Sequence, residues 1–390
     1  MDGKKVAFGI IGVGNMGKAH ASFISTSQVC ELKAVCDNNP AAFDRLPENI
    51  RSKVTCYTDA EKFLSDPAID AVLIAVPHYF HVDLAIQALE HGKHIIVEKP
   101  ISVHKKEAER LLKAAEKYPH LVQSIMFNQR TLPAHIKLKQ LLDSGELGQL
   151  RRINWIVTDW FRTQFYYDSG DWRASWRGEG GGVLLNQCPH QLDLMQWFFG
   201  MPCKVRAAVK LGKYHNIEVE DEINAYLEYA DGKSANFIST TGEAPGINRL
   251  EVVGERGLLT LENNQITFRR NVQNTSEYSQ TAKAGFTPPE CWECKIPIPG
   301  AAVVGHLAII ENTAKAIQKQ EELKSPLAEG IRGLELGNAI LYSGLKDQSV
   351  EMPLDADAYA EMLDGLIAES KWDWKKPVQE ENSSDFGSSF

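Results

Sequence analysis

Cysteine is scarce in this chain, and its scarcity argues against a fold held together by disulfides. Only 7 of the 390 residues are cysteine, an odd number that is scattered along the sequence. Small secreted domains that depend on disulfides have a much higher density of cysteine. We therefore expect reduced thiols and a cytoplasmic protein.

Positive charge and long apolar runs are also lacking. Lys and Arg number 42 against 51 Asp and Glu, which gives a formal net charge of -9. A general nucleic-acid binder or a protein attracted to anionic membranes needs a basic surface, so we expect neither partner. The apolar run near the N-terminus, VAFGIIGVG, is too short to cross a membrane and lacks a cleavage-like site.

Short apolar runs alternate with helical patterns over the first third of the chain. The runs predict six strands, at residues 4–11, 31–37, 53–57, 69–76, 93–97 and 121–127. Strands that are apolar throughout and separated by helices are typical of a parallel sheet covered on both faces. We therefore predict an α/β fold with a doubly wound Rossmann domain over residues 1–127.

The pattern after residue 127 changes to strands without helices between them. A long strand is predicted at 151–161, and further strand-like runs between Lys204 and Phe268 indicate antiparallel meanders. Helical periodicity returns at 306–320 and 331–345. These patterns predict a second, α+β domain over 128–375. The polar, serine-rich tail at 376–390 is expected to be poorly ordered.

A glycine-rich run connects the first predicted strand to the first helix. It has the GxGxxG pattern and consists of Gly12, Val13, Gly14, Asn15, Met16 and Gly17. The first glycine permits a tight turn, the second lets the backbone approach a pyrophosphate, and the third permits close packing of helix and strand. The helix N-terminus adds free N–H groups for the anion. We predict a dinucleotide site here, the alternative being an ordinary turn.

The second predicted strand ends at Asp37, where a carboxylate can discriminate between cofactors. It would accept hydrogen bonds from the adenosine ribose hydroxyls and repel a 2′-phosphate. Asn38 and Asn39 follow, with no Lys or Arg to bind that phosphate. We therefore expect NAD as the cofactor rather than NADP. The alternative is that Asp37 only caps the following helix.

Two further segments place chemistry-bearing residues at predicted element ends. Glu98 and Lys99 follow the fifth strand, and ligands of open α/β sheets bind outside the carboxyl ends of strands. The pair is expected where a nicotinamide would lie, unless it is only a solvated rim. The segment GGGVLLNQCPHQLD, residues 180–193, puts Asn186 and His190 four residues apart, on one face of a shared helix. Pro189 fits only a first helical turn or a kink.

Three motifs in order resemble the glucose–fructose oxidoreductase, inositol dehydrogenase and MocA family. They are GxGxxG, then AVPHYFHVDLAIQALEHGKHIIVEKPIS, then GGGVLLNQCPHQLD, and the resemblance covers nearly the whole chain. It implies a second domain with a large, mostly antiparallel open sheet. It also implies oxidation or reduction of secondary alcohols and carbonyls of sugars and cyclitols with NAD or NADP. A homodimer or homotetramer is expected by analogy.

The resemblance also implies roles for individual residues. Lys99 in the EKP motif matches the catalytic lysine, and His190 matches the histidine of the third motif. Asn186 stands where many relatives have aspartate. The resemblance also places Pro77 and His78 at the cofactor, where many relatives have asparagine in place of His78. It places Asn128 and Arg130 near the active site, and Trp172 and Arg173 at the cofactor or the substrate.

Hydride-transfer chemistry needs few further groups. A histidine titrates near neutrality, so we predict that His190 removes the hydroxyl proton as general base. Lys99 would stabilise the developing alkoxide or relay the proton. Asn186 would orient the substrate hydroxyl or the imidazole. The aromatic stretch 160–172 is interpreted as a substrate wall or a packed domain junction, with three candidates for binding hydroxyls, Arg162, Asp168 and Arg173.

The predicted function is NAD-dependent oxidation of a secondary alcohol of a pyranose, glycoside or cyclitol, with a 3-keto sugar as a candidate product. Two alternatives stay open. One is an NAD-recycling enzyme that cleaves a glycosidic bond after transient oxidation, and the other is a non-catalytic NAD-binding sugar sensor. No metal is expected, because the CxxC formed by Cys291 and Cys294 has no second ligand pair nearby and is interpreted as a loop.

Overall fold

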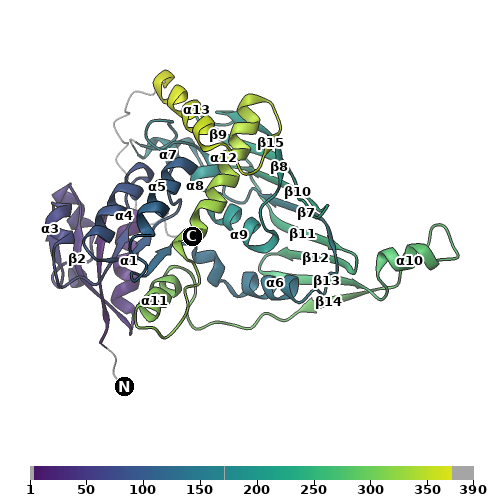
Figure 1. Ribbon diagram of the computed structural model, residues 1–390, viewed down its shortest axis with the longest axis horizontal. Helices are drawn as coiled ribbons and strands as arrows, with labels where there is room; N and C mark the ends of the chain where they lie inside the picture. Colours follow the sequence, from purple (N-terminus) through teal and green to yellow (C-terminus); the bar gives the residue numbers. More distant parts are fainter. Residues whose placement is uncertain (1–3, 171, 371–390) are drawn as a thin grey trace.

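The computed structural model describes residues 4–170 and 172–370 and contains two β-sheets (Figure 1). The tail predicted at 376–390 lies outside the described residues. Within those residues, no helix has both the length and the apolar character needed to span a bilayer.

The N-terminal sheet has six parallel strands in the order β3-β2-β1-β4-β5-β6, so all six predicted strands are confirmed. They are β1 (Val6–Ile11), β2 (Cys30–Cys36), β3 (Thr55–Tyr57), β4 (Ala71–Ile74), β5 (His94–Val97) and β6 (Gln123–Ile125). The strand order reverses between β1 and β4. A crevice outside the carboxyl ends at such a point is where doubly wound sheets bind ligands.

Two apolar cores cover the two faces of this sheet, because successive strand residues point to opposite sides. Phe8 and Ile10 of β1 pack in one core with α1 (Asn15–Thr26) and α11 (Gly305–Ile317). Ile74 of β4 packs in the other with α4 (His81–Glu90) and α5 (Lys105–Ala115). Helix α11 comes from far along the chain, so the later part of the sequence completes the N-terminal core.

The second sheet has nine strands in the order β14-β13-β12-β11-β7-β10-β9-β8-β15. They are β7 (Leu150–Val157), β8 (Lys204–Leu211), β9 (Glu220–Glu228), β10 (Ser234–Thr240), β11 (Asn248–Gly254), β12 (Gly257–Glu262), β13 (Gln265–Asn271), β14 (Cys291–Ile296) and β15 (Val350–Glu351). Only β7 and β10 pair in parallel. The predicted meanders are present as β8-β9-β10 and β11-β12, with β7 inserted between them, and β13 and β14 extend the second meander.

Two details of the sequence interpretation are wrong. The strand predicted at 151–161 begins at Leu150 and ends at Val157; just beyond it, the Thr158 N–H donates to the Ile247 carbonyl oxygen and its hydroxyl donates to Glu243. The CxxC is not in a loop but in the edge strand β14. Cys291 and Cys294 are three residues apart, so their side chains point to opposite faces and cannot bind one ion. Within the described residues no cluster of three potential metal ligands occurs.

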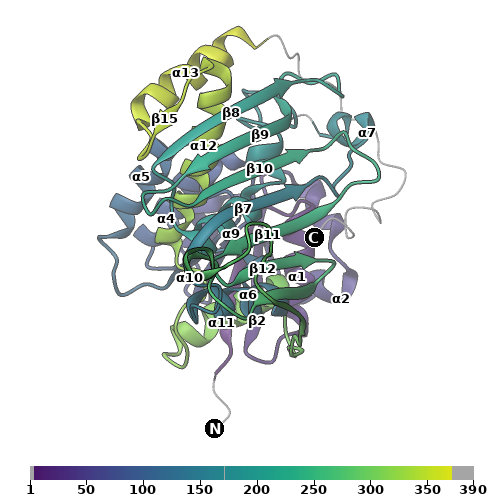
Figure 2. The ribbon, with the colours of Figure 1, turned by 90° about the vertical axis from the view of Figure 1, so that its right-hand side faces the viewer.

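A helical layer separates the two sheets (Figures 1 and 2). It contains α6 (Pro133–Asp143), α8 (Val183–Asn186), α9 (Pro189–Phe199) and α12 (Gly330–Lys346), and α13 (Ala356–Glu369) packs beside α5. All residues of α9 except Trp197 are buried. A helix buried on every side lies in the interior of the protein, so α9 carries His190 to the junction of the two sheets.

The turn after β1 depends on two glycines in backbone contact. Gly12 has φ +92°, in the left-handed region that favours glycine. A Cβ at Gly17 would lie 1.8 Å from the carbonyl oxygen of Gly12. The third glycine of the GxGxxG run is therefore required for close contact between helix α1 and the turn.

Gly17→Ala is expected to destabilise the protein by about 1–3 kcal/mol, because overpacking against a main-chain oxygen forces a backbone shift. Urea unfolding followed by circular dichroism measures the effect. Gly365→Ala is the matched control, since that glycine lies exposed in α13 with no atom within 4 Å of an added Cβ. The control should be neutral or slightly stabilising. Equal unfolding midpoints for both variants would contradict the packing argument.

Candidate active site

The N-terminus of α1 provides a binding place for an anion at the carboxyl end of β1. Gly14 is the N-cap, no side chain caps the helix, and no acidic residue occupies its first turn, where Asn15 and Met16 lie. No atom lies within 4 Å of a Cβ built on Gly14, so the space in front of it is open. Free N–H groups facing open space fit the pyrophosphate of a dinucleotide.

Asp37 supports the glycine turn from the neighbouring strand. Its Oδ2 accepts a hydrogen bond from the Val13 N–H at 2.8 Å, and its Oδ1 accepts one from the Asn39 N–H at 2.9 Å. The next helical turn is capped by Asn39, whose side chain accepts from Ala41 N–H. Capping is therefore the role of Asn39, and Asp37 remains at the strand end where an adenosine ribose would lie.

Glu98 is buried and faces α1, so the pair Glu98–Lys99 is not a solvated rim. Its Oε1 lies 2.6 Å from Nε2 of His20. Burial alone would raise the pKa of this carboxyl, but the hydrogen bond and charge of His20 outweigh it and lower the pKa to about 2. His306 lies edge-on to His20, and Asn128 Nδ2 lies 3.2 Å from Nδ1 of His306. The structure thus places Asn128 beside this histidine pair.

Lys99 joins the two halves of the site. Its Nζ donates to the main-chain carbonyl oxygen of Asn186 at 2.9 Å. Burial lowers the pKa of Lys99, and the charges of Arg173 and Arg162 lower it further, whereas Glu98 and Glu179 act in the opposite direction. The ammonium therefore lies where the carboxyl end of β5 meets the glycine-rich segment of the second sheet.

Asn186 and His190 belong to two helices rather than one, which corrects the shared-face prediction. Helix α8 ends at Asn186, and α9 begins at Pro189, which occupies a first helical turn as predicted. His190 is buried, and its Nδ1 has no hydrogen-bond partner among the described residues. Burial lowers its pKa well below 6.5, and the charge of Lys99 adds to the effect. The imidazole is therefore neutral at neutral pH, as a general base must be.

The side chain of Asn186 is bound by two residues that the sequence analysis did not assign. Its Nδ2 donates to Oε1 of Glu179, and its Oδ1 accepts from the Tyr166 hydroxyl at 3.4 Å. Glu179 directly precedes the three glycines, and an acidic residue in a segment otherwise built for close packing is the signal that could have identified it. Tyr166 lay unassigned within the aromatic stretch 160–172.

Several predicted residues gather on the cofactor side of this cluster. Pro77 precedes the short turn of His78–Phe80, and the His78 ring lies edge-on to Trp172 with ring centroids 5.5 Å apart. Arg173 stacks over Trp172 and donates to the Tyr166 hydroxyl at 2.9 Å. The guanidinium of Arg162 lies over the Tyr166 ring, 5.2 Å from its centroid. Asp168, at the end of its short helix, accepts from Gln164 instead.

The guanidinium of Arg130 is bound by carboxylates of the protein itself. Its guanidinium forms two hydrogen bonds with the carboxylate of Asp193, at 2.8 and 2.6 Å, and a third with Glu329. The Arg130 and Asp193 side chains are almost completely buried. This ion pair joins the chain after β6 to α9 and fixes the helix that carries His190.

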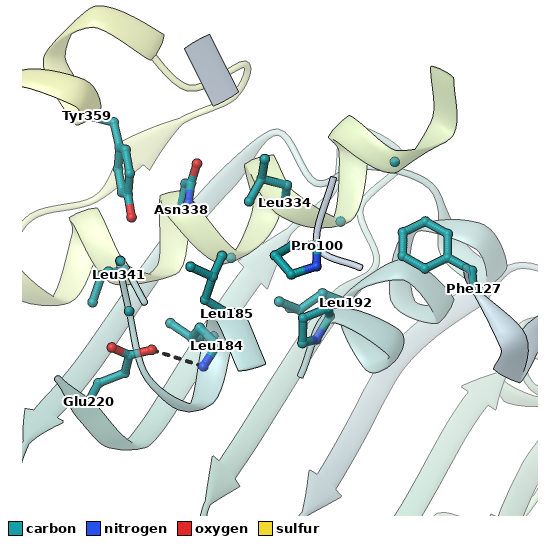
Figure 3. A pocket seen from close by; sticks show the side chains of 16 residues that line it. Pro100, Phe127, Leu184, Leu185, Leu192, Glu220, Leu334, Asn338, Leu341 and Tyr359 are labelled. Carbon is teal, nitrogen blue, oxygen red and sulfur yellow. Dashed lines mark hydrogen bonds between the residues drawn. The ribbon is translucent and has the colours of Figure 1, made fainter. Parts of the chain in front are cut away.

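A narrow apolar cavity lies behind the glycine-rich segment (Figure 3). Leu184, Leu192 and Leu334 line it together with Pro100, between α8, α9 and α12. At its polar end Glu220 accepts from the Leu184 N–H at 3.0 Å, and burial raises the pKa of this carboxyl to about 7. The apolar lining suits side-chain packing and not a polyhydroxylated substrate.

The glycine run 180–182 passes through this region with no space for side chains. A Cβ on Gly180 would lie 2.2 Å from the Val103 side chain of the first domain, and one on Gly182 would lie 2.0 Å from the Glu220 carbonyl oxygen. Gly180 therefore allows close approach to the first domain and Gly182 allows close approach to β9, so this run is not a flexible connector.

Comparison with known protein families shows that two parts of the chain match the models of two domains of one oxidoreductase family. Residues 6–125 match "Oxidoreductase family, NAD-binding Rossmann fold" of GFO_IDH_MocA, and residues 135–260 match the "GFO/IDH/MocA C-terminal domain". The two matches follow one another along the chain and together cover more than half of it.

Individual relatives match over nearly their full lengths. A levoglucosan dehydrogenase of Pseudarthrobacter phenanthrenivorans is 26% identical over 88% of this chain and 97% of its own. An inositol 2-dehydrogenase of Rhizobium meliloti is 25% identical over 89% and 99%. The crystal structure of the WlbA dehydrogenase of Chromobacterium violaceum, in complex with NADH and UDP-GlcNAcA, has a TM-score of 0.77 at 23% identity and covers 91% of this chain and 98% of its own. This last likeness concerns the fold alone.

Arg130→Met is expected to destabilise the protein by about 3–5 kcal/mol, because it leaves the Asp193 carboxylate buried without its partner. The matched control is Arg110→Met, which removes an exposed pairing with Glu107 and Asp83 and should cost at most about 1 kcal/mol. Chemical unfolding of both variants in the same buffer makes the comparison. Similar losses in the two variants would show that the Arg130 pair does not hold α9.

Proposed function

This chain belongs to the GFO/IDH/MocA family of NAD-binding oxidoreductases, and from that premise we propose that it oxidises a secondary alcohol of a pyranose sugar, a glycoside or a cyclitol to a ketone. The observation that carries the proposal is the hydrogen bond from Lys99 Nζ to the Asn186 carbonyl oxygen at 2.9 Å. It brings the lysine at the end of β5 to the segment that leads directly to His190.

The chemistry divides between the cofactor and two side chains. NAD, when bound, supplies the acceptor for the hydride. His190 is neutral because burial lowers its pKa, and an unprotonated ring nitrogen can take a proton from a hydroxyl. Lys99, with its positive charge, stabilises the oxygen as it becomes an alkoxide. The main-chain carbonyl oxygen of Asn186 orients the ammonium group of Lys99.

The residues around this pair support a polar ring as substrate. Arg162 and Asn128 each have a buried polar side-chain atom, Nε and Oδ1, without a partner among the described residues. Buried polar atoms in this condition are suited to bind hydroxyl groups. The levoglucosan and inositol relatives support an anhydrosugar or glycoside and a cyclitol, respectively. Within this class, a 3-keto sugar is the product that we propose for a glycoside.

A homodimer or homotetramer is also proposed for the functional protein. The outward residues Arg206 of β8 and Tyr226 of β9 are exposed, and β14 is a free edge strand of the second sheet. An exposed sheet of this size offers a self-complementary surface to a second copy.

The proposed activity is tested with purified protein, NAD and a panel of pyranoses, glycosides, anhydrosugars and cyclitols. Formation of NADH, followed by absorbance, is the expected result with at least one member of the panel. Binding of NAD without NADH formation from any member would overturn the proposal and favour a sensor. Release of an aglycone without net NADH would instead favour the glycoside-cleaving alternative.

Lys99→Met should lower kcat by about 10²–10³-fold and leave NAD binding intact, because one electrostatic contact to the developing alkoxide is lost. Steady-state kinetics and NAD titration by fluorescence measure the two effects. Lys106→Met removes an exposed lysine that pairs with Asp357 and serves as the control with unchanged rates. An unchanged kcat in the Lys99 variant would exclude the proposed role.

Asp37→Ala should reduce the preference for NAD over NADP by at least about tenfold, because it removes a carboxylate that repels the 2′-phosphate of NADP. A tenfold change corresponds to about 1.4 kcal/mol of binding free energy. The ratio of kcat/KM for the two cofactors is the measurement. Asp44→Ala, which removes an exposed partner of Arg51, is the control. If the ratio is the same in the Asp37 variant and the wild type, another residue selects the cofactor.

A further inference from the structure

Glu179 is a buried carboxylate in direct contact with the segment that orients Lys99. Its side chain is among the most buried charged groups of the protein, with 2% of the residue exposed. Oε2 accepts from the Ala174 N–H at 2.7 Å, and Oε1 accepts from Nδ2 of Asn186. A carboxylate can only accept, which determines the orientation of the Asn186 amide.

The charge state of Glu179 follows from the groups that face it. Burial raises the pKa of Glu179 above its ordinary value, and the charge of Arg173, the Ala174 N–H, the Asn186 amide and the charge of Lys99 offset only part of this effect. Both carboxylate oxygens accept N–H groups, and this geometry favours the ionised form against the effect of burial. The other titratable groups facing it are His78, whose Nδ1 is 3.4 Å from the Glu179 carbonyl oxygen, Tyr167 and Glu220.

Lys99 needs such a carboxylate. Burial and the charges of Arg173 and Arg162 all favour its neutral form, and Glu98 and Glu179 are the two carboxylates that favour the ammonium. Glu98 has the larger effect of the two; its Oε1 is paired with His20 and its Oε2 accepts from the Lys99 main-chain N–H at 3.0 Å. Glu179 is on the side of Asn186, whose carbonyl oxygen holds the lysine.

We propose that Glu179 is a positioning residue for the dehydrogenase reaction: it holds the amide of Asn186 and keeps Lys99 protonated. The proposal deepens the function proposed above and depends on it. In this arrangement Glu179 acts through its neighbours and does not contact the reacting atoms.

Glu179→Gln tests the charge, because glutamine keeps the size of the side chain and an oxygen that can accept from Ala174. In this variant the pKa of Lys99 should fall by about one pH unit or more. The alkaline limb of kcat against pH should move to lower pH by the same amount, since the reaction needs the ammonium. NAD affinity should be unchanged. Wild-type positions for both the pKa and the alkaline limb would overturn the proposal.

The pKa of Lys99 can be read without turnover. Reductive methylation with ¹³C-formaldehyde gives each lysine an NMR signal, and Lys99→Arg identifies the signal of Lys99. Glu218→Gln is the matched control, because Glu218 accepts from the Trp176 N–H on the same loop but is not part of the site. The control should titrate like the wild type, which separates loss of the Glu179 charge from a general disturbance of the loop.

The exchange variant Glu179→Gln with Asn186→Asp reverses the amide–carboxylate pair and returns the charge to the site. It should restore the wild-type alkaline limb and most of kcat, a rescue that a purely structural role would not produce. If Glu179→Gln fails to fold, the exchange variant tests the proposal by itself. An alkaline limb of kcat that is still displaced to lower pH in the exchange variant would overturn the proposal.

Failure of this inference differs from failure of the proposed function. A wild-type protein that forms no NADH from any substrate sinks the function, although the NMR titration still reports on the Glu179–Lys99 link. The inference alone fails if three results coincide: the wild-type protein forms NADH, Lys99→Met loses activity, and Glu179→Gln leaves the pKa of Lys99 unchanged.

Discussion

The hydrogen bond between the Lys99 ammonium and the Asn186 carbonyl oxygen is the contact on which the site depends. The two partners are 87 residues apart in sequence: Lys99 follows strand β5 of the first sheet, and Asn186 ends helix α8. Their meeting requires that the carboxyl end of β5 and the entrance of α9 lie against one another. The ion pair of Arg130 with Asp193 and the glycine run 180–182 both serve that requirement, one by attraction and one by removal of side-chain bulk.

A buried cluster of charges is costly unless its members compensate one another. Here the cations Lys99, Arg162 and Arg173 are opposed by Glu98 and Glu179. The two carboxylates have different partners, since Glu98 is paired with His20 and Glu179 with Asn186. Burial lowers the pKa values of both Lys99 and His190, and the two carboxylates act against this effect at Lys99 by favouring its ammonium form.

Local sequence patterns predicted helices and strands well where a residue type has a single structural role, such as apolar residues in buried strands or glycine in a tight turn. The apolar runs identified all six strands of the first sheet, and the GxGxxG spacing identified the turn in which Gly17 contacts Gly12. Patterns failed where distant residues decide the outcome. Cys291 and Cys294 looked like a loop because β14 is an exposed edge strand, whose pairing with β13 supplies the regularity that its sequence lacks.

The sequence by itself determined the Rossmann domain and the meandering second sheet, because apolar runs and glycine spacing have local causes. The candidate residues Lys99, Asn186 and His190 came from the resemblance of its motifs to a known family. Only the tertiary structure decided that Asn186 and His190 lie on separate helices and that Arg130 is committed to Asp193. It also decided that the Asn186 amide donates to the buried carboxylate of Glu179. Partners of buried charges are chosen by packing across the chain, and spacing along the chain does not reveal them.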